Sequence, residues 1–284
     1  EAVTTWDPAP EFLLLVGSMS QLPMPFVEDG YSDTYFGNID EDLFVEIHPG
    51  RFPADSAAEV EVMVAKTLQY ERTPSLNDPG YYTSAALLLY EDWDDDDWLH
   101  YYGDVNWETG LMMDAGFTTV HNITYGTTPS PASTFQDQLE GHLAYAAHHG
   151  VVGGHTGCDW PGYSLYPSTV DNGPMLPVIV SYTCQTMAYS PDWACGGELW
   201  MRAGSLGDLR GGVAFVGQSV SCSYCAHWRS SLRRGFWGHI FEDISDTDVC
   251  RIGEAVEAGR LHYYDEYHLS SQYHASNLYG DPEL

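Results

Sequence analysis

The stretches VVGGHTG (residues 151–157) and LPVIVSYTC (residues 176–184) carry the clearest indication of the fold. In each, a short apolar run typical of a buried strand ends at a chemically useful side chain, His155 in the first and Cys184 in the second. Buried strands of a parallel α/β sheet read as continuous apolar runs, and catalytic groups lie just beyond their carboxyl ends. Two such strands side by side would bring an imidazole and a thiol to one edge of the sheet. A thiol beside a base is the arrangement that a cysteine hydrolase requires.

Strands and helices alternate on both sides of these stretches. Apolar runs predict strands at 12–16, 44–52, 84–90, 117–123, 150–154, 177–183 and 211–217. Ser56 and Glu59 form a capping box that predicts the start of a helix ending near Thr73. Further helices are predicted near 105–115, 132–149, 194–204 and 228–242. This order indicates a largely parallel sheet with right-handed crossovers and helices on its faces.

Several segments resemble the gingipain family of cysteine peptidases, which belong to the caspase-like hydrolases. EFLLLVGSMSQLPMP at 11–25 is similar to a strand of that family that ends in Val-Gly before a polar loop. The segment 35–72 matches its Gly-Arg-Phe, then helix, then Tyr-Glu-Arg pattern, and GGVAFVGQS at 211–219 and NLYGDPEL at 277–284 resemble its last strands. The resemblance covers almost the whole chain in the correct order. It implies an α/β fold, a caspase-like three-layer sandwich with a mainly parallel sheet flanked by helices.

The resemblance also implies a division of the chain at the polar stretch TPSLNDPG, residues 73–80. Residues 1–75 are expected to be a remnant of the smaller N-terminal subdomain with its connecting helix, and residues 76–284 the caspase-like catalytic subdomain. Gingipains carry further strands ahead of the segment at 11–25, and this chain opens at Glu1 rather than Met. Either this lineage trims that subdomain, or a cleaved N-terminal segment, or another chain of the same precursor, is expected as a partner.

The same comparison implies the roles of the catalytic residues. The family's catalytic histidine falls on His155 and its nucleophile on Cys184. An acidic residue that orients the histidine falls on Glu91, with Asp92 as the less favoured choice. We expect no cofactor to be required for this chemistry.

Substrate and oxyanion contacts follow from the resemblance too. Asp104 is the nearest match to the acidic residue that receives a basic substrate side chain, and Tyr224 lies near the aromatic wall of that pocket. The amides of Thr156 and Gly157 are expected to bind the oxyanion. Two positions depart from the family pattern. Thr156 stands where Gly directly follows the histidine, and Thr183 precedes the nucleophile in place of a smaller residue.

All six cysteines lie in the second half of the chain: Cys158, Cys184, Cys195, Cys222, Cys225 and Cys250. An even number in a secreted protein indicates disulfides, but a nucleophilic Cys184 leaves an odd number for pairing. For Cys222 and Cys225 we expect a local or structural disulfide. A zinc site would need a second pair of similar spacing, and the sequence offers none.

The charge is strongly negative, with 41 acidic residues against 10 basic ones and a net charge of −31. Such a field repels phosphate backbones, so nucleic acid is excluded as a partner. No apolar run approaches the roughly 18–20 residues that cross a bilayer. We expect a secreted or cell-surface protein.

Asp94, Asp95 and Asp96 belong to the run EDWDDDDW at 91–98. Clustered carboxylates are hard oxygen ligands suited to calcium, so a structural calcium is one expectation, and a solvated acidic loop is an equal alternative. Three histidines, His142, His148 and His149, fall within the helix predicted at 132–149. Their spacing along a helix does not place them on one face, so we expect no metal site there.

The sequence therefore predicts an extracellular cysteine endopeptidase of gingipain type that cleaves protein or peptide substrates, with a preference for basic residues implied by the resemblance. The alternative is a catalytically silent caspase-like domain that serves as a structural or assembly subunit on a cell surface. A calcium-dependent binding module is a third possibility. A free and unusually reactive Cys184 thiol would favour the first function, and a disulfide at Cys184 the second.

Overall fold

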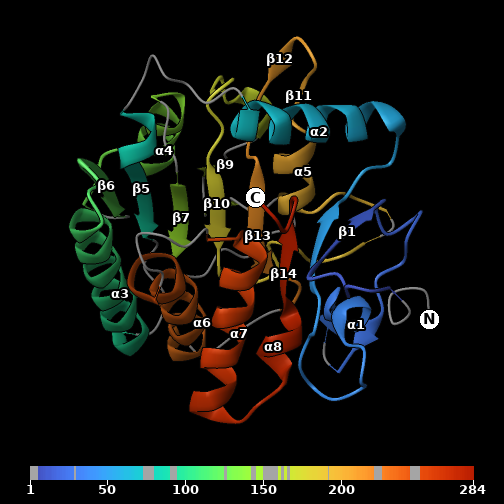
Figure 1. Ribbon diagram of the computed structural model, residues 1–284. Helices are drawn as coiled ribbons and strands as arrows, with labels where there is room; N and C mark the ends of the chain where they lie inside the picture. The colour runs from blue at the N-terminus through green and yellow to red at the C-terminus, as the bar shows by residue number, and fades with distance from the viewer. Residues whose placement is uncertain are drawn as a thin grey trace.

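Eight strands form one sheet through the centre of the protein (Figure 1). The structure, a computed structural model, describes residues 6–28, 30–72, 80–89, 95–124, 127–141, 145–149, 159–160, 163–164, 167–190, 192–220, 226–243 and 250–284. Across the sheet the strands lie in the order β1 (Phe12–Val16), β4 (His48–Phe52), β14 (Ser276–Tyr279), β13 (Ala214–Gln218), β10 (Val178–Ser181), β7 (Tyr145–His149), β5 (Ser84–Leu89) and β6 (Thr119–Thr124).

Most neighbouring strands in this sheet are parallel. β13, β10, β7, β5 and β6 all run in one direction. β14 is antiparallel to β13 and parallel to β4, which is in turn parallel to β1. The largely parallel sheet predicted from the alternation of strands and helices is confirmed.

Helices cover both faces of the sheet, because successive side chains of each strand point to opposite sides. On one face, Leu88, Ile179 and Phe215 belong to the core that includes α2 (Ala57–Arg72), α4 (Pro131–Glu140) and α5 (Gly196–Arg202). On the other face, Leu87 and Val180 pack in the core built by α3 (Asp95–Asp114), α6 (Ala226–Gly238) and α7 (Ile252–Tyr267). The three-layer α/β sandwich is therefore confirmed.

Shorter elements complete the described chain. They are α1 (Thr34–Gly37), α8 (Ser271–Ala275), the 3₁₀ helices Tyr81–Thr83 and Pro167–Thr169, the π-helical segment His239–Asp243, and the short strand pairs β2 (Phe26–Val27) with β3 (Gly30–Tyr31), β8 (Asp159–Trp160) with β9 (Tyr163–Ser164), and β11 (Gly204–Ser205) with β12 (Asp208–Leu209). Among all the residues that the structure describes, no helix has the length and apolar character needed to span a bilayer.

The predicted capping box is present at the start of α2. The Glu59 backbone N–H donates to Ser56 Oγ at 3.3 Å, and the Ser56 N–H donates to Glu59 Oε2 at 3.2 Å. These two bonds satisfy amides that the first helical turn would otherwise leave without partners.

The prediction of one helix over 132–149 is wrong in its second half. The helix α4 ends at Glu140, and Tyr145–His149 form the strand β7, so His148 and His149 lie on a strand rather than a helix. β7 pairs on both sides, with β5 and with β10, and such pairing overrides the weak helix preference of AYAAHH. The predicted strand at 150–154 lies outside the described residues. Helix α7, which was not predicted, follows residue 251.

The predicted boundary at residue 75 falls in 73–79, outside the described residues. Strands β1 and β4, from the predicted N-terminal remnant, join the same sheet as the strands of the predicted catalytic part. Arg51 in β4 stands opposite Tyr279 in β14 where the two parts meet. The division into two subdomains stays a prediction.

Candidate active site

The strands that lead toward the two predicted catalytic residues are neighbours. β7 pairs with β10 in parallel, with His148 opposite Ser181 near the carboxyl ends. Parallel neighbours end at the same edge of a sheet, which is where ligands bind in open α/β folds. The two strands therefore end side by side, at His149 and at Ser181. The predicted strand that leads to His155 lies outside the described residues and stays a prediction.

A tight turn after β10 carries Cys184. The Gln185 N–H donates to the carbonyl oxygen of Val220, just beyond β13, at 3.0 Å. Gln185 has a φ of 57°, a left-handed conformation that a residue other than glycine adopts only when its surroundings impose it. Thr186 Oγ1 donates to the Ser181 carbonyl oxygen at 3.1 Å and closes the turn. The turn thus holds the nucleophile candidate at the carboxyl end of β10.

The Cys184 thiol lies against a buried arginine. Arg229 Nη1 donates to Cys184 Sγ at 3.5 Å, and Arg229 is fully buried while Cys184 is 5% exposed. The guanidinium carbon of Arg229 also lies 5.2 Å from the centroid of the Tyr101 ring, a distance typical of a cation–π contact. A permanent positive charge therefore stands beside the sulfur atom, contributed by α6.

Sequence reasoning did not identify Arg229 as part of the site. One signal was present: three of the chain's ten basic residues, Arg229, Arg233 and Arg234, lie within a single turn and a half of the predicted helix at 228–242. In a strongly acidic chain, such a cluster indicates a local requirement for positive charge.

Asp104, the candidate for binding a basic substrate side chain, lies on α3 and is buried. It accepts hydrogen bonds from Arg233 Nη2 at 2.6 Å, from Ser230 Oγ at 2.7 Å and from Arg234 Nη2 at 3.2 Å. Arg233 is buried as well, whereas the Arg234 side chain is 45% exposed. The carboxylate is therefore already paired with cations of the chain itself.

Glu108, one helical turn beyond Asp104, is a second buried carboxyl group on α3. Burial raises its pKa to about 8, even though Arg233 Nε lies 3.5 Å from Glu108 Oε1 and opposes the increase. Ionisable groups with displaced pKa values often lie at functional sites, and structural ion pairs displace them as well. Here the group adjoins the pair formed by Arg233 and Asp104.

Several predicted site residues lie outside the described residues: Glu91, Asp92, Asp94, His155, Thr156, Gly157 and Tyr224. Asp95 and Asp96 begin α3, but the placement of their side chains is not described either. The roles assigned to these residues stay predictions.

Three of the six cysteines are described, and all three carry free thiols: Cys184, Cys195 and Cys250. Cys195 is fully buried at the start of α5, and burial raises its pKa. Burial also raises the pKa of Cys250, to about 11. The free state of Cys184 is the one that the peptidase function requires. Cys222 and Cys225 lie outside the described residues, so their predicted disulfide stays a prediction.

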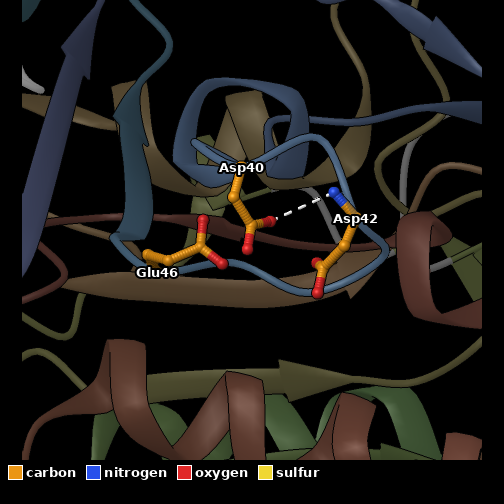
Figure 2. Close-up of side chains that lie close together, drawn as sticks. All are labelled: Asp40, Asp42 and Glu46. Atoms are coloured by element: carbon orange, nitrogen blue, oxygen red, sulfur yellow. Dashed lines mark hydrogen bonds between the residues drawn. The ribbon is translucent and has the colours of Figure 1, made fainter.

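A cluster of acidic side chains lies on the loop between α1 and β4 (Figure 2). Asp40, Asp42 and Glu46 are exposed, and one carboxylate oxygen of each lies within 4.8 Å of the others. Asp40 Oδ1 accepts the Asp42 backbone N–H at 3.1 Å, and Glu46 Oε2 accepts the Ile39 N–H at 2.6 Å. These oxygens therefore shape the loop. In the sequence, these residues lie far from the acidic run predicted to bind calcium at Asp94, Asp95 and Asp96.

Sequence comparison finds relatives of this chain among curated proteins. An uncharacterized protein of Archaeoglobus fulgidus is 30% identical over 220 residues, covering 68% of this chain and 51% of the relative. Gingipain R2 of Porphyromonas gingivalis is 25% identical over 230 residues, covering 78% of this chain and 30% of the relative. The chain thus spans about half, or less, of the length of these curated relatives.

Solved structures support the caspase-like fold. The crystal structure of the Arg-specific cysteine proteinase gingipain R superposes with a TM-score of 0.87 at 19% identity, covering 100% of this chain and 66% of that one. A complex of the pro- and mature domains of Porphyromonas gingivalis RgpB gives the same TM-score and identity. A family profile described as Peptidase family C25 matches residues 1–284. The chain therefore belongs to peptidase family C25, the gingipain family of cysteine peptidases.

Proposed function

We propose that this chain is a cysteine endopeptidase that cleaves protein or peptide substrates, with Cys184 as its nucleophile. One observation carries the proposal: the free Cys184 thiol stands on a tight turn at the carboxyl end of β10, against a buried guanidinium. The neighbouring strand β7 ends six residues before His155 in the sequence. A thiol beside a cation at a strand end is the environment of a reactive cysteine.

In the proposed reaction the Cys184 thiolate attacks the scissile carbonyl carbon. A sulfur–carbon bond forms, and the carbonyl oxygen takes up the negative charge. Backbone N–H groups of Cys184, Thr156 and Gly157 are the proposed donors to that oxygen. His155 protonates the leaving amine as the carbon–nitrogen bond breaks, and water then hydrolyses the acyl-enzyme. Glu91 is the proposed partner that orients the imidazole.

A preference for a basic residue before the cleaved bond is the next part of the proposal. It is supported by the similarity to gingipain R2 and by the Arg-specific proteinase among the structural neighbours. Asp104 is the candidate pocket acid, with Tyr224 beside it. A substrate guanidinium would have to compete there with Arg234, the exposed one of the two arginines that Asp104 binds. We therefore expect a weaker preference for basic side chains than an unpaired carboxylate would give.

The low exposure of Cys184 favours one alternative. A thiol that is 5% exposed is also compatible with a catalytically silent caspase-like domain that acts as a structural or assembly subunit on a cell surface. Such a domain would keep the turn and the arginine contact as packing features. Reactivity of the thiol separates the two functions.

We also propose a secreted or cell-surface location and a propeptide as partner. The excess of 41 acidic over 10 basic residues suits an exposed setting, and a structural neighbour is a complex of pro- and mature domains. Immunodetection in the medium, on intact cells and in the cytosol of the source organism tests the location. Detection in the cytosol alone would contradict it.

Thiol labelling and peptide hydrolysis test the function together. The native, non-reduced protein is treated with iodoacetamide over a series of pH values, and the labelled cysteine is identified by peptide mass spectrometry. We expect fast labelling of Cys184 that persists below about pH 7, where an ordinary thiol is protonated. The raised pKa values of Cys195 and Cys250 make these two thiols internal controls that stay unlabelled.

The hydrolysis assay uses peptides that carry Arg, Lys, Leu or Asp before the scissile bond. Cys184→Ala is expected to abolish cleavage. His155→Ala is expected to slow labelling and to lower kcat by at least about 100-fold, the lower range for loss of a general acid. An inert Cys184 together with no hydrolysis of any peptide would contradict the peptidase function and favour the silent domain.

A further inference from the structure

We propose that Arg229 is a catalytic residue of this site: its guanidinium is the cationic partner that keeps the Cys184 sulfur ionised. The inference rests on the proposed function, because it assigns a role within the same reaction. It also identifies a source of thiolate stabilisation on α6, separate from the imidazole of His155.

Contact geometry supports this role. Arg229 Nη1 lies 3.5 Å from Cys184 Sγ, within hydrogen-bonding range for sulfur, and the arginine is fully buried. Tyr101, itself fully buried on α3, places its ring under the guanidinium and limits its movement. The turn closed by Thr186 fixes the backbone that carries the sulfur. Both partners of the contact are therefore fixed before any substrate arrives.

The chemistry of arginine determines which form of the Cys184 side chain, thiol or thiolate, the contact stabilises. An arginine side chain stays protonated at every relevant pH, so it cannot act as the base. It donates hydrogen bonds and interacts far more favourably with a thiolate than with a neutral thiol. When the S–H bond breaks, its proton passes to His155 or to water and the electron pair remains on sulfur beside the guanidinium. The contact with Arg229 thus favours the thiolate of Cys184 even though the side chain is buried.

A neighbouring arginine has a different partner. Arg233, one helical turn later on α6, also lies near the Tyr101 ring, at 5.5 Å from its centroid. Its Nη2 donates to Asp104 at 2.6 Å, so its charge is neutralised by a carboxylate of α3. Arg229 directs Nη1 to the sulfur of Cys184. Two buried arginines of one helix, over one aromatic ring, therefore provide a matched pair for a test.

Other ionisable groups near the contact belong to three elements. Among the described residues, Asp104 and Glu108 on α3 pair with Arg233 on α6, which shares the Tyr101 ring with Arg229. Tyr182 at the end of β10 is buried, which raises its pKa and keeps it neutral. His155 and Glu91 are the groups predicted to approach from the loops. Burial raises the pKa of Glu108 to about 8, so Glu108→Gln is included as a control.

The experiment measures the pH midpoint of Cys184 labelling by iodoacetamide in the full chain. For Arg229→Gln we expect the midpoint to rise by about one pH unit or more and labelling near pH 6 to slow by about tenfold. Rates should converge above about pH 9, where even an ordinary thiol is ionised. Arg233→Gln and Glu108→Gln are expected to keep the wild-type midpoint. Circular dichroism and thermal unfolding confirm that each variant is folded.

A wild-type midpoint in folded Arg229→Gln would overturn the proposal, as would an equal shift in Arg233→Gln. If Arg229→Gln does not fold, His155→Ala gives an independent measurement. Without the imidazole, the midpoint should still lie below that of an ordinary cysteine, about pH 8.5. A midpoint at that ordinary value would overturn the role of Arg229.

The outcomes separate the inference from the function. A shifted midpoint in Arg229→Gln, in a protein that cleaves no peptide, supports the thiolate partner and contradicts the peptidase. An unshifted midpoint with full peptide hydrolysis contradicts the role of Arg229 and leaves the peptidase function standing. In an active enzyme, kcat/KM of Arg229→Gln should fall at low pH and approach the wild-type value at high pH.

Discussion

Lys66 illustrates how much a single buried charge influences this chain. It is the only lysine, and it lies fully buried on α2. Its Nζ donates to the carbonyl oxygens of Trp200 at 3.2 Å and Met201 at 2.7 Å, in the last turn of α5. Terminal carbonyls of a helix have no partner within the helix, so Lys66 joins α2 to α5 through groups that need a donor.

We expect Lys66 to make stability depend on pH. Burial lowers its pKa from 10.5 to about 7 in the folded protein, so between these values the unfolded chain binds more protons. The unfolding free energy should therefore rise as pH increases from about 7 to about 10, by up to about 1.4 kcal/mol per pH unit. Lys66→Met removes this contribution. Urea unfolding of both proteins over this range measures it, and equal pH slopes would contradict the expectation.

At the scale of the elements, α6 and α7 approach each other backbone to backbone. A Cβ at Gly235 would lie 2.5 Å from the carbonyl oxygen of Ala258 and 2.7 Å from the Cα of Gly259. Only glycine leaves room for this approach. Since Arg229 also lies on α6, the position of that helix bears on both stability and the candidate active site.

Gly235→Ala is expected to destabilise the protein by about 1–3 kcal/mol, because the added methyl group forces the two helices apart. Gly110→Ala provides the matched control on α3, where a Cβ meets nothing within 4 Å. There the substitution should stabilise by about 0.5–1 kcal/mol through helix propensity alone. Thermal and urea unfolding compare the two variants. If Gly235→Ala left the free energy of unfolding unchanged, the two helices would tolerate a larger separation.

For the whole molecule, charge is the dominant feature. The net charge of −31 produces self-repulsion in the folded state, and many of the basic side chains already serve internal pairs such as Arg51 with Asp33 and Arg233 with Asp104. The outer surface therefore carries almost uncompensated negative charge. Such a surface favours solubility and repels polyanions.

Added salt is expected to stabilise the protein by screening this repulsion. Each kcal/mol gained would raise Tm by about 2–4 °C for a chain of this size. Differential scanning calorimetry in increasing NaCl measures the effect near pH 8. Near pH 5, close to the isoelectric point of 4.3, the same salt series should change Tm much less. Equal effects at both pH values would indicate that salt acts on something other than net charge.

Several parts of the fold and the candidate site could be predicted from local patterns. The apolar run at 178–181 and the capping box at Ser56 act within a few residues, so their strand and helix follow from sequence alone. The strand at 145–149 could not be predicted in the same way. Its residues have no strong local preference, and pairing on both sides decides its conformation.

The sequence by itself determined the α/β alternation, the family and the place of Cys184 at a strand end, because apolar periodicity and motif order are properties of the chain. Only the tertiary structure decided which charged groups meet. Arg229 reaches Cys184 from α6, and Asp104 on α3 is bound by Arg233. These residues are far apart in sequence. The rotation of α3 and α6 about their own axes is set by how each helix packs against the sheet and against the adjacent helix. That rotation selects the arginine that faces the thiol and the one that binds the carboxylate.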